Sequence, residues 1–483
     1  MELGIVHRPG RVEITLTPGM QGAAPASRAR LARRTATFEV DAELGAVHPD
    51  LLVLSALLCA RPWVGTRTEI TSSVAASPAL AEALRTGPRL RLRSVSPDVQ
   101  PRPRPGGDGR DGDGDGGGVP GLCFSGGTDS VAALAMMPER TRSYHLLRRA
   151  PVDERRATMF DTRAAEQSCA RVRATGRAVV VVPSDVEYLR DPTGFPHDFT
   201  TAVPLLLHAD ADRLDAVAWG APLEATYRLQ RGIFRDLADS PFLREWGAVF
   251  DAVGLPVLLP VAGVSEVVTS TIVARHELGS AAQSCVRGPR LGRPCGRCAK
   301  CARKTLLAGA VTGSWPDDHV LQRQWRGVEP RQHLLADPIK VEPVVSHCVH
   351  RYLADGGADP LLRLVVAKTG PDPLPWLTRS YPPALEHLPA PYRQEVQQRL
   401  LTVAEPMTAQ QEQAVRDYAV PGPEDPSRAA AQRELEAWLA AHPSHDRMAR
   451  SVSRVRRVLR AGVRRWGPRT WAIRGPGSNT GSG

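Results

Sequence analysis

Five short apolar segments, separated by stretches long enough to form helices, constrain the fold of this chain more than any other feature. They are rich in Val, Ala and Leu and lie at residues 121–124, 144–147, 178–182, 216–219 and 257–259. A strand that is apolar at nearly every position is buried on both faces, which is typical of a parallel sheet covered by helices. The central part of the chain is therefore predicted to be α/β, with a parallel sheet.

The first hundred residues show a different pattern, which predicts a small α+β domain over residues 1–100. Apolar and polar residues alternate at 12–16 and again at 89–93, as in half-buried strands. Residues 101–118 then read PRPRPGGDGRDGDGDGGG, a segment with eight Gly that cannot bury apolar surface. It is predicted to be a flexible linker. A calcium loop is the alternative, but the spaced carboxylates and closing Glu of an EF-hand are missing.

The C-terminal part carries most of the positive charge. Residues 311–420 predict a helical extension, and residues 421–483 predict a basic amphipathic helical tail with a disordered end. Ten Arg and one Asp between positions 445 and 474 supply +9 of the formal net charge of +11, so the rest of the chain is nearly neutral. The tail predicts docking on the protein itself, on a partner protein, or on an anionic membrane or nucleic acid, through an apolar stripe: Met448, Val452, Val455, Leu459, Val463 and Trp466.

Two features predict a cytoplasmic protein. The N-terminus lacks the charged and apolar regions of a secretory signal, and no apolar run reaches the length of a membrane span. In a reducing compartment eight Cys do not predict disulfides, particularly since four of them lie within residues 285–301. Such clustering favours a metal site.

The segment SGGTDS at residues 125–130 directly follows the apolar segment 121–124 and precedes a helical stretch. In a strand–turn–helix arrangement, successive backbone N–H groups and the positive end of the helix dipole converge on one point and favour an anion. Gly126 and Gly127 allow phosphate oxygens to approach the backbone, Ser125 and Ser130 add hydroxyl groups, and Asp129 can cap the helix or hold Mg²⁺. The Walker A and dinucleotide-binding patterns are both missing here, which excludes those classes at this turn.

The four clustered cysteines follow the spacing Cys285-x9-Cys295-x2-Cys298-x2-Cys301. Four thiolates form a closed tetrahedral shell around Zn²⁺, which predicts a structural zinc knuckle over residues 285–301. An iron–sulfur cluster and no metal at all are the alternatives. Neighbouring cations can offset the charge of the thiolates: Arg297, Lys300, Arg303 and Lys304.

The SGGTDS segment resembles the SGGxDS loop of the PP-loop ATP pyrophosphatases. This resemblance implies an adenine nucleotide α-hydrolase-like (HUP) sheet, and an enzyme that splits ATP between the α- and β-phosphates. Such enzymes adenylate a substrate oxygen before an amine or sulfur nucleophile displaces AMP. Together with the cysteine knuckle, the loop resembles that of the 7-cyano-7-deazaguanine synthases, which use ATP and ammonia. This second resemblance covers residues 119–310 and extends to the segments VAWG at 217–220, LPV at 259–261 and QSC at 283–285.

The resemblance implies a set of site residues and ligands. Ser125 and Asp129 would act in catalysis, Mg²⁺ would shield the phosphates, and the adenine would lie against the strand end at 146–149. Further phosphate partners could come from Arg149, Arg228, Arg231, Lys300, Arg303 or Lys304. The ATP-binding residues would be Ser125, Gly126, Gly127, Thr128, Asp129, Ser130, Leu147 and Gly220.

The pocket for the acceptor departs from that family. His197 and Asp198 follow Pro196 where a cation is usual, Glu266 stands where a Lys is expected, and residues 148–151 replace an aromatic-Gly-Gln stretch. The sequence therefore predicts an ATP-dependent ligase that forms a C–N bond to a different carboxyl or carbonyl acceptor, such as a deazaguanine carboxylate, with an amine or ammonia. His197 and Asp198 could act as a base pair, although a helix cap is the commoner role.

Two other functions remain open. One is a tRNA-modifying sulfurtransferase of the same superfamily, in which the cysteines would hold an iron–sulfur cluster. The other is a nucleotide-gated binding module without turnover, which would use the basic tail to bind a partner.

Overall fold

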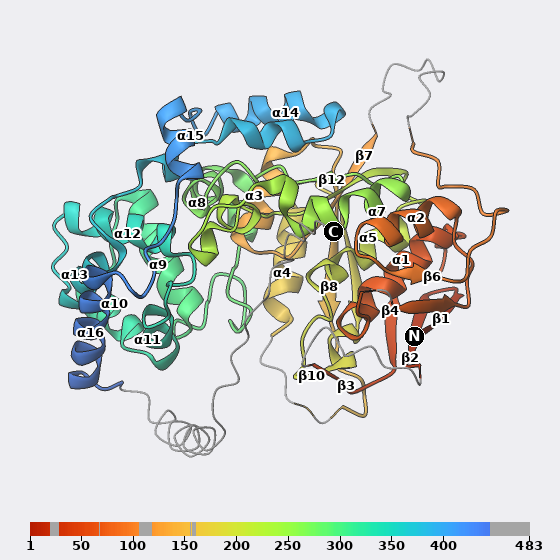
Figure 1. Cartoon of the computed structure of the whole chain (residues 1–483), viewed down its shortest axis with the longest axis horizontal. Coiled ribbons are helices and arrows are strands. Elements are labelled where there is room, and N and C mark those ends of the chain that lie inside the picture. Colours follow the sequence, from red (N-terminus) through yellow and green to blue (C-terminus); the bar gives the residue numbers. More distant parts are fainter. Residues whose placement is uncertain (20–28, 67, 106–117, 155, 157–160, 445–483) are drawn as a thin grey trace, which may run out of the picture.

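The computed structural model describes residues 1–19, 29–66, 68–105, 118–154, 156 and 161–444 (Figure 1). Its strands are β1 (Glu2–Arg8), β2 (Arg11–Thr17), β3 (Arg30–Leu31), β4 (Thr35–Glu39), β5 (Glu69–Ser72), β6 (Arg91–Leu92), β7 (Val119–Cys123), β8 (Arg142–Arg148), β9 (Val179–Ser184), β10 (Arg190–Asp191), β11 (Leu214–Ala218) and β12 (Val257–Leu258). Its helices are α1 (Pro49–Ala60), α2 (Pro78–Thr86), α3 (Thr128–Met136), α4 (Arg163–Arg173), α5 (Val203–His208), α6 (Leu223–Thr226), α7 (Gly247–Ala252), α8 (Glu266–Arg275), α9 (Ala299–Thr312), α10 (Asp318–Trp325), α11 (Val328–Leu334), α12 (Glu342–Ala354), α13 (Pro360–Thr369), α14 (Ala390–Leu401), α15 (Ala409–Arg416) and α16 (Pro426–Ala441).

A ten-stranded, mostly parallel sheet forms the centre of the molecule, in the order β12-β11-β7-β8-β9-β4-β2-β1-β5-β6. The five strands β12 to β9 are all parallel and coincide with the five apolar segments, so the α/β prediction is confirmed. From β7 the chain first adds β8 and β9 on one side and later adds β11 and β12 on the other. The strand order therefore reverses between β7 and β11. Open α/β sheets bind ligands at the carboxyl ends of the strands at such a switch point.

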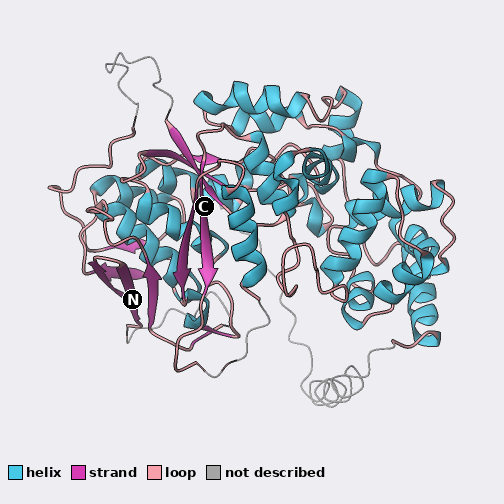
Figure 2. Ribbon diagram, turned by 180° about the vertical axis from the view of Figure 1, so that it is seen from behind, coloured by secondary structure: helices cyan, strands magenta, loops and turns pink. Residues whose placement is uncertain are grey.

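Helices cover both faces of the parallel strands (Figure 2). Successive strand residues point to opposite faces, so Leu122 packs in one apolar core and Cys123 in the other. Helices α3, α4 and α8 belong to the core around Leu122, whereas α1, α5 and α7 belong to the core around Cys123. This two-sided burial is the reason why the central residues of these strands are mostly apolar.

The first hundred residues contain both strands and helices. Strands β1, β2, β4, β5 and β6 continue the central sheet, whereas β3 pairs with β10 in a separate two-stranded sheet. β4 runs antiparallel to β9 and meets it at the pair Phe38 and Ser184. Helix α1 packs against α5, and both lie in the same apolar core. Arg102, inside the predicted linker, is buried, and its guanidinium binds Asp210 at 2.7 Å and the carbonyl oxygen of Leu214 at 2.9 Å.

The described residues from 311 onward are helical, as predicted, and most of them lie at the end of the molecule opposite the N-terminal strands (Figure 1). The buried guanidinium of Arg428 fixes α16 to this region, because it contacts Asp337 at 2.9 Å and Glu342 at 2.8 Å. The predicted apolar stripe of the tail lies outside the described residues. Within the described parts of the chain, every helix is too short or too polar to cross a membrane.

Candidate functional site

The predicted phosphate loop forms the turn between β7 and α3. Gly126 adopts a φ of +72°, a left-handed conformation that favours glycine, and Gly127 is the N-cap of α3. The hydroxyl of Ser130 accepts from the backbone N–H of Ser125 at 3.3 Å, and the Ser125 and Ser130 hydroxyls are 3.1 Å apart. The serines therefore lie on the inner side of the turn, next to the backbone N–H groups.

Gly220 lies where β11 ends, on the other side of the switch point. A Cβ atom at this position would lie 2.4 Å from the carbonyl oxygen of Asp129, so only glycine allows the strand end to approach the start of α3 this closely. The carboxylate of Asp129 accepts a hydrogen bond from the hydroxyl of Thr269 in α8 at 2.7 Å. The structure thus brings together the loop and Gly220, which are far apart in the sequence.

A cavity of about 680 Å³ opens at this switch point. Most of the predicted nucleotide-binding residues line it, whereas Gly127 and Thr128 do not; Thr128 instead lines a second cavity of about 480 Å³ behind the loop. The predicted residues on the wall of the first cavity are Ser125, Gly126, Asp129, Ser130, Leu147 and Gly220.

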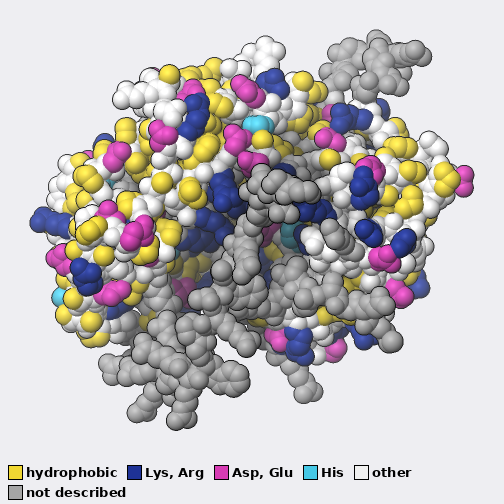
Figure 3. Space-filling view, in the orientation of Figure 1, with side chains coloured by type: hydrophobic (Ala, Val, Ile, Leu, Met, Phe, Trp, Pro, Cys, Tyr) yellow, Lys and Arg dark blue, Asp and Glu magenta, His cyan; other side chains and the backbone are white. Residues whose placement is uncertain are grey.

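Positive side chains surround this cavity, and Figure 3 shows Lys and Arg gathered around the hollow on this face. Four cations that line it have no ion-pair partner among the described residues: Arg228, Arg231, Lys300 and Lys340. Lys340 comes from the helical C-terminal region, so this region completes the wall. Of the other predicted phosphate partners, Arg149 instead pairs with Glu39 at 2.6 Å.

Aromatic side chains form another part of the wall, and no pattern in the sequence predicts them. Phe199 lies 4.9 Å from Phe242 and 5.2 Å from Trp219, measured between ring centroids, and Phe195 also lines the cavity. His197 lies beside Phe199 and caps a short 3₁₀ helix, because its Nδ1 accepts from the backbone N–H of Phe199 at 3.3 Å. The cap interpretation of His197 is confirmed, and its aromatic neighbours can stack against a planar ring.

Glu266, which stands where a Lys was expected, is buried in an ion-pair network. Its carboxylate contacts Arg303 at 2.9 Å and Lys304 at 3.0 Å. Burial by itself would raise the pKa of Glu266, but the charges of Lys304, Arg303 and Lys300 outweigh it and lower the pKa to about 2. Burial and the Glu266 charge together raise the pKa of nearby Glu224 to about 8. Arg303 and Lys304 therefore neutralise an acid rather than the cysteine thiolates.

Replacing Glu266 by Gln is expected to destabilise the fold, because it leaves the buried Arg303 and the partly buried Lys304 without a counter-charge. A folded pKa near 2 against an ordinary value of 4.5 corresponds to about 3 kcal/mol of unfolding free energy above pH 4.5. The depressed pKa means that this contribution is lost as the pH falls from 4.5 toward 2. Urea unfolding at pH 7 and at pH 3 should therefore show a smaller difference between the two proteins at pH 3. Glu405→Gln, an exposed ion-pair partner, is the control and should cost under about 0.5 kcal/mol.

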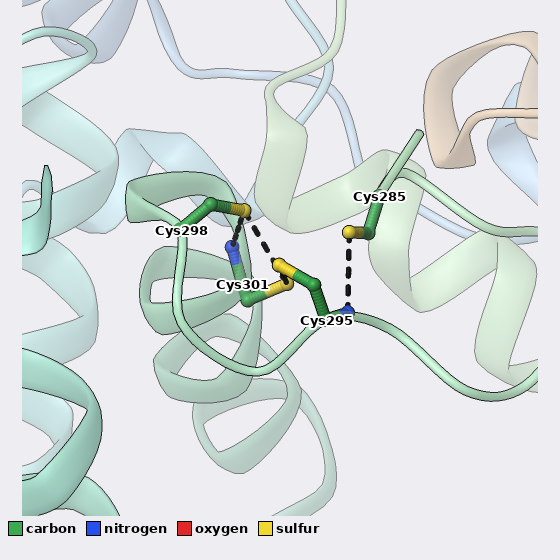
Figure 4. A group of neighbouring side chains, drawn as sticks. All are labelled: Cys285, Cys295, Cys298 and Cys301. Atoms are coloured by element: carbon green, nitrogen blue, oxygen red, sulfur yellow. Dashed lines mark hydrogen bonds between the residues drawn. The ribbon is translucent and has the colours of Figure 1, made fainter. Parts of the chain in front are cut away.

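The four predicted metal ligands come together in space (Figure 4). All four sulfur atoms lie within 4.8 Å of one another, and the Sγ of Cys301 is 3.5 Å from that of Cys298 and 3.7 Å from that of Cys295. Zn–S bonds of about 2.3 Å in a tetrahedron separate the ligands by about 3.8 Å, so the cluster fits a metal such as zinc. The backbone N–H of Cys301 donates to Cys298 Sγ, and that of Cys295 donates to Cys285 Sγ.

Hydrogen bonds connect the segment just before Cys285 to the phosphate loop. The backbone N–H of Gln283 donates to the carbonyl oxygen of Gly126 at 2.8 Å. This hydrogen bond lies only two residues before Cys285 in the chain. The hydroxyl of Ser284 accepts from the backbone N–H of Thr128 at 3.2 Å and lies 2.9 Å from its hydroxyl. A metal at the cysteines would therefore hold the segment that supports the loop.

Comparison with known proteins covers only part of this site. A search of curated proteins and a search of solved structures each gave no match. Residues 245–419 match the model of a family of unknown function, DUF6395. This stretch contains β12, the cysteine cluster and the helices up to α15, but it does not contain the phosphate loop.

Proposed function

We propose that the protein is an ATP-dependent ligase of the PP-loop pyrophosphatase type, with a HUP-like sheet. It would adenylate a carboxyl or carbonyl acceptor, release pyrophosphate and AMP, and join the acceptor to an amine or ammonia. One observation carries this proposal: the SGGTDS turn and the first turn of α3 place Ser125, Gly126, Asp129 and Ser130 on the wall of a large cavity at the switch point of the parallel sheet. Phosphate-binding loops in α/β sheets occupy this position.

The residues around the loop suit the triphosphate of ATP. Backbone N–H groups of the turn and the hydroxyls of Ser125 and Ser130 would donate to phosphate oxygens, and Lys300 lies on the same wall. Asp129 would hold Mg²⁺, which supplies positive charge to the phosphates. Leu147, at the end of β8, would contact the adenine. Pyrophosphate would leave from the loop, where preorganised donors stabilise the developing charge.

The remainder of the cavity suits a planar, negatively charged acceptor. Phe199, Trp219 and Phe242 offer aromatic faces, while Arg228 and Lys340 offer unpaired positive charge. The acid at position 266 does not oppose this assignment, because two cations already neutralise it. An aromatic carboxylate, such as a carboxylated deazapurine, has the shape and charge that this wall can bind.

A pyrophosphate-release assay tests the proposal. The zinc-loaded protein is incubated with Mg²⁺ and ATP against a panel of aromatic carboxylates, including carboxylated deazapurines, with ammonium or hydroxylamine as the amine. We expect equal amounts of pyrophosphate and AMP with at least one acceptor, and mass spectrometry should detect the amide product. Nucleotide binding with no pyrophosphate from any acceptor would instead favour a binding module. A brown preparation that contains iron would favour the sulfurtransferase.

A further inference from the structure

His145, a residue with no role so far, lies in β8 at the base of the phosphate loop. Its Nδ1 is 2.9 Å from the carbonyl oxygen of Phe124, the residue directly before Ser125. A carbonyl oxygen can only accept, so the proton of the neutral ring must be on Nδ1. The other nitrogen, Nε2, therefore carries a free lone pair. The residue as a whole is 7% exposed, and it lines the cavity.

The second histidine on the cavity wall has the opposite tautomer. Nδ1 of His197 accepts a backbone N–H, so the proton of this ring is on Nε2 and it can only donate to a ligand. His197 therefore cannot act as the base unless it gives up its cap. Among the described histidines that line the cavity, His145 alone offers a free acceptor nitrogen.

The surroundings of His145 keep it uncharged at neutral pH. Burial lowers its pKa below the ordinary value, the hydrogen bond to Phe124 opposes this shift, and the charge of Arg148 on the same strand lowers the pKa further. Asp129 and Lys300 are charged groups on the same cavity wall. A neutral imidazole with an accessible lone pair can accept a proton.

We propose that Nε2 of His145 is the base that takes the proton from the amine in the second half of the reaction. This inference rests on the proposed ligase function. The nitrogen lone pair of the amine attacks the acyl carbon of the adenylate and forms the C–N bond. The C–O bond to AMP breaks, its electron pair leaves with the AMP phosphate oxygen, and one amine proton moves to Nε2. The products are the amide, AMP and a protonated His145, which returns its proton to solvent.

Two variants separate the base from the structural role of the ring. His145→Asn keeps an N–H near the position of Nδ1 that can donate to Phe124 but removes Nε2. His145→Gln places an amide near Nε2 that cannot act as a base. His208→Asn is the matched control, because Nδ1 of His208 also lies 2.8 Å from a backbone carbonyl oxygen, that of Pro204, while its Nε2 is buried and does not face the cavity.

The first experiment needs no acceptor. Diethyl pyrocarbonate modifies accessible neutral imidazole nitrogens, and peptide mass spectrometry locates the adduct. We expect His145 to be modified, His208 to remain unmodified, and α,β-methylene ATP with Mg²⁺ to reduce the modification of His145 by at least about tenfold. Modification that is absent in the free protein, or unchanged by saturating nucleotide, would overturn the inference.

The second experiment measures the two half-reactions separately, with the acceptor that gives most pyrophosphate in the screen. ATP–pyrophosphate exchange reports adenylation, and hydroxamate formation from hydroxylamine reports amine transfer. We expect both His145 variants to keep exchange within about threefold while amine transfer falls by about 10²- to 10⁴-fold, with partial rescue by added imidazole. An equal loss in both half-reactions, or unchanged amine transfer, would overturn the role of His145. Exchange that is absent in the wild-type protein would overturn the ligase function itself.

Discussion

Replacing Asp129 by Asn is expected to reduce pyrophosphate release by about 10³-fold or more, because it removes the negative charge that would hold Mg²⁺ at the phosphates. The amide oxygen can still accept from the Thr269 hydroxyl, which lies 2.7 Å from the carboxylate. The unfolding free energy should therefore change by less than about 1 kcal/mol. Steady-state pyrophosphate release and urea unfolding of the same preparation check both expectations.

Glu139→Gln is a matched control for this variant. Glu139 is exposed just beyond the other end of α3, so the substitution removes one negative charge near the same helix but away from the cavity. We expect its pyrophosphate release to stay within about twofold of the wild type. Normal turnover of Asp129→Asn would contradict the assignment of this carboxylate. Equal losses in the two variants would contradict it as well.

Removing the metal is expected to weaken nucleotide binding as well as to destabilise the protein. Cys298 is the N-cap of α9, and the segment leading into Cys285 is hydrogen-bonded to the loop at Gly126 and Thr128. Cys298→Ser should lose the metal, so the segment before Cys285 is no longer held in place against the loop. Nucleotide binding must then also order the loop, which lowers the affinity. We expect a loss of about tenfold or more in affinity for Mg²⁺ and α,β-methylene ATP, measured by calorimetry, together with a lower Tm.

Cys348→Ala provides the comparison, because Cys348 is a buried thiol outside the cluster. It should keep one metal ion per chain and the wild-type nucleotide affinity, even if the small cavity costs about 1 kcal/mol of stability. Wild-type affinity in metal-free Cys298→Ser would show that the cluster does not support the loop. In that case its role would be confined to the local fold of residues 285–301.

Local residue types were sufficient to predict the parallel strands, the loop and the cysteine cluster. The strands at 178–182 and 216–219 are apolar because they are buried on both faces, and this pattern is visible without the fold. The continuation of the sheet into the N-terminal strands depends on the pairing of Phe38 with Ser184, and no local signal specifies such a distant pair.

The parts of the site that the sequence did not predict come from tertiary contacts. Lys340 reaches the cavity only because the helical region packs against the sheet, and Glu266 is compensated only because α9 brings two cations to it. His145 did leave a signal: it is the one histidine in the five apolar segments, and its segment, 144–147, forms the strand next to the loop strand. A buried imidazole needs a hydrogen-bond partner, and its second nitrogen then becomes available to a ligand.

The way the N-terminal strands join the body has a consequence for a nicked protein. A protease cut within the Gly-rich segment would leave two fragments that remain in contact at three places. Strand β4 pairs with β9, and α1 packs against α5. The buried guanidinium of Arg102 also donates to the carbonyl oxygens of Ala209 and Leu214 in the larger fragment. The fragments should therefore migrate together in gel filtration and separate only in denaturant. We therefore expect two separately produced fragments to reassociate, with the smaller one supplying the strands at one edge of the sheet.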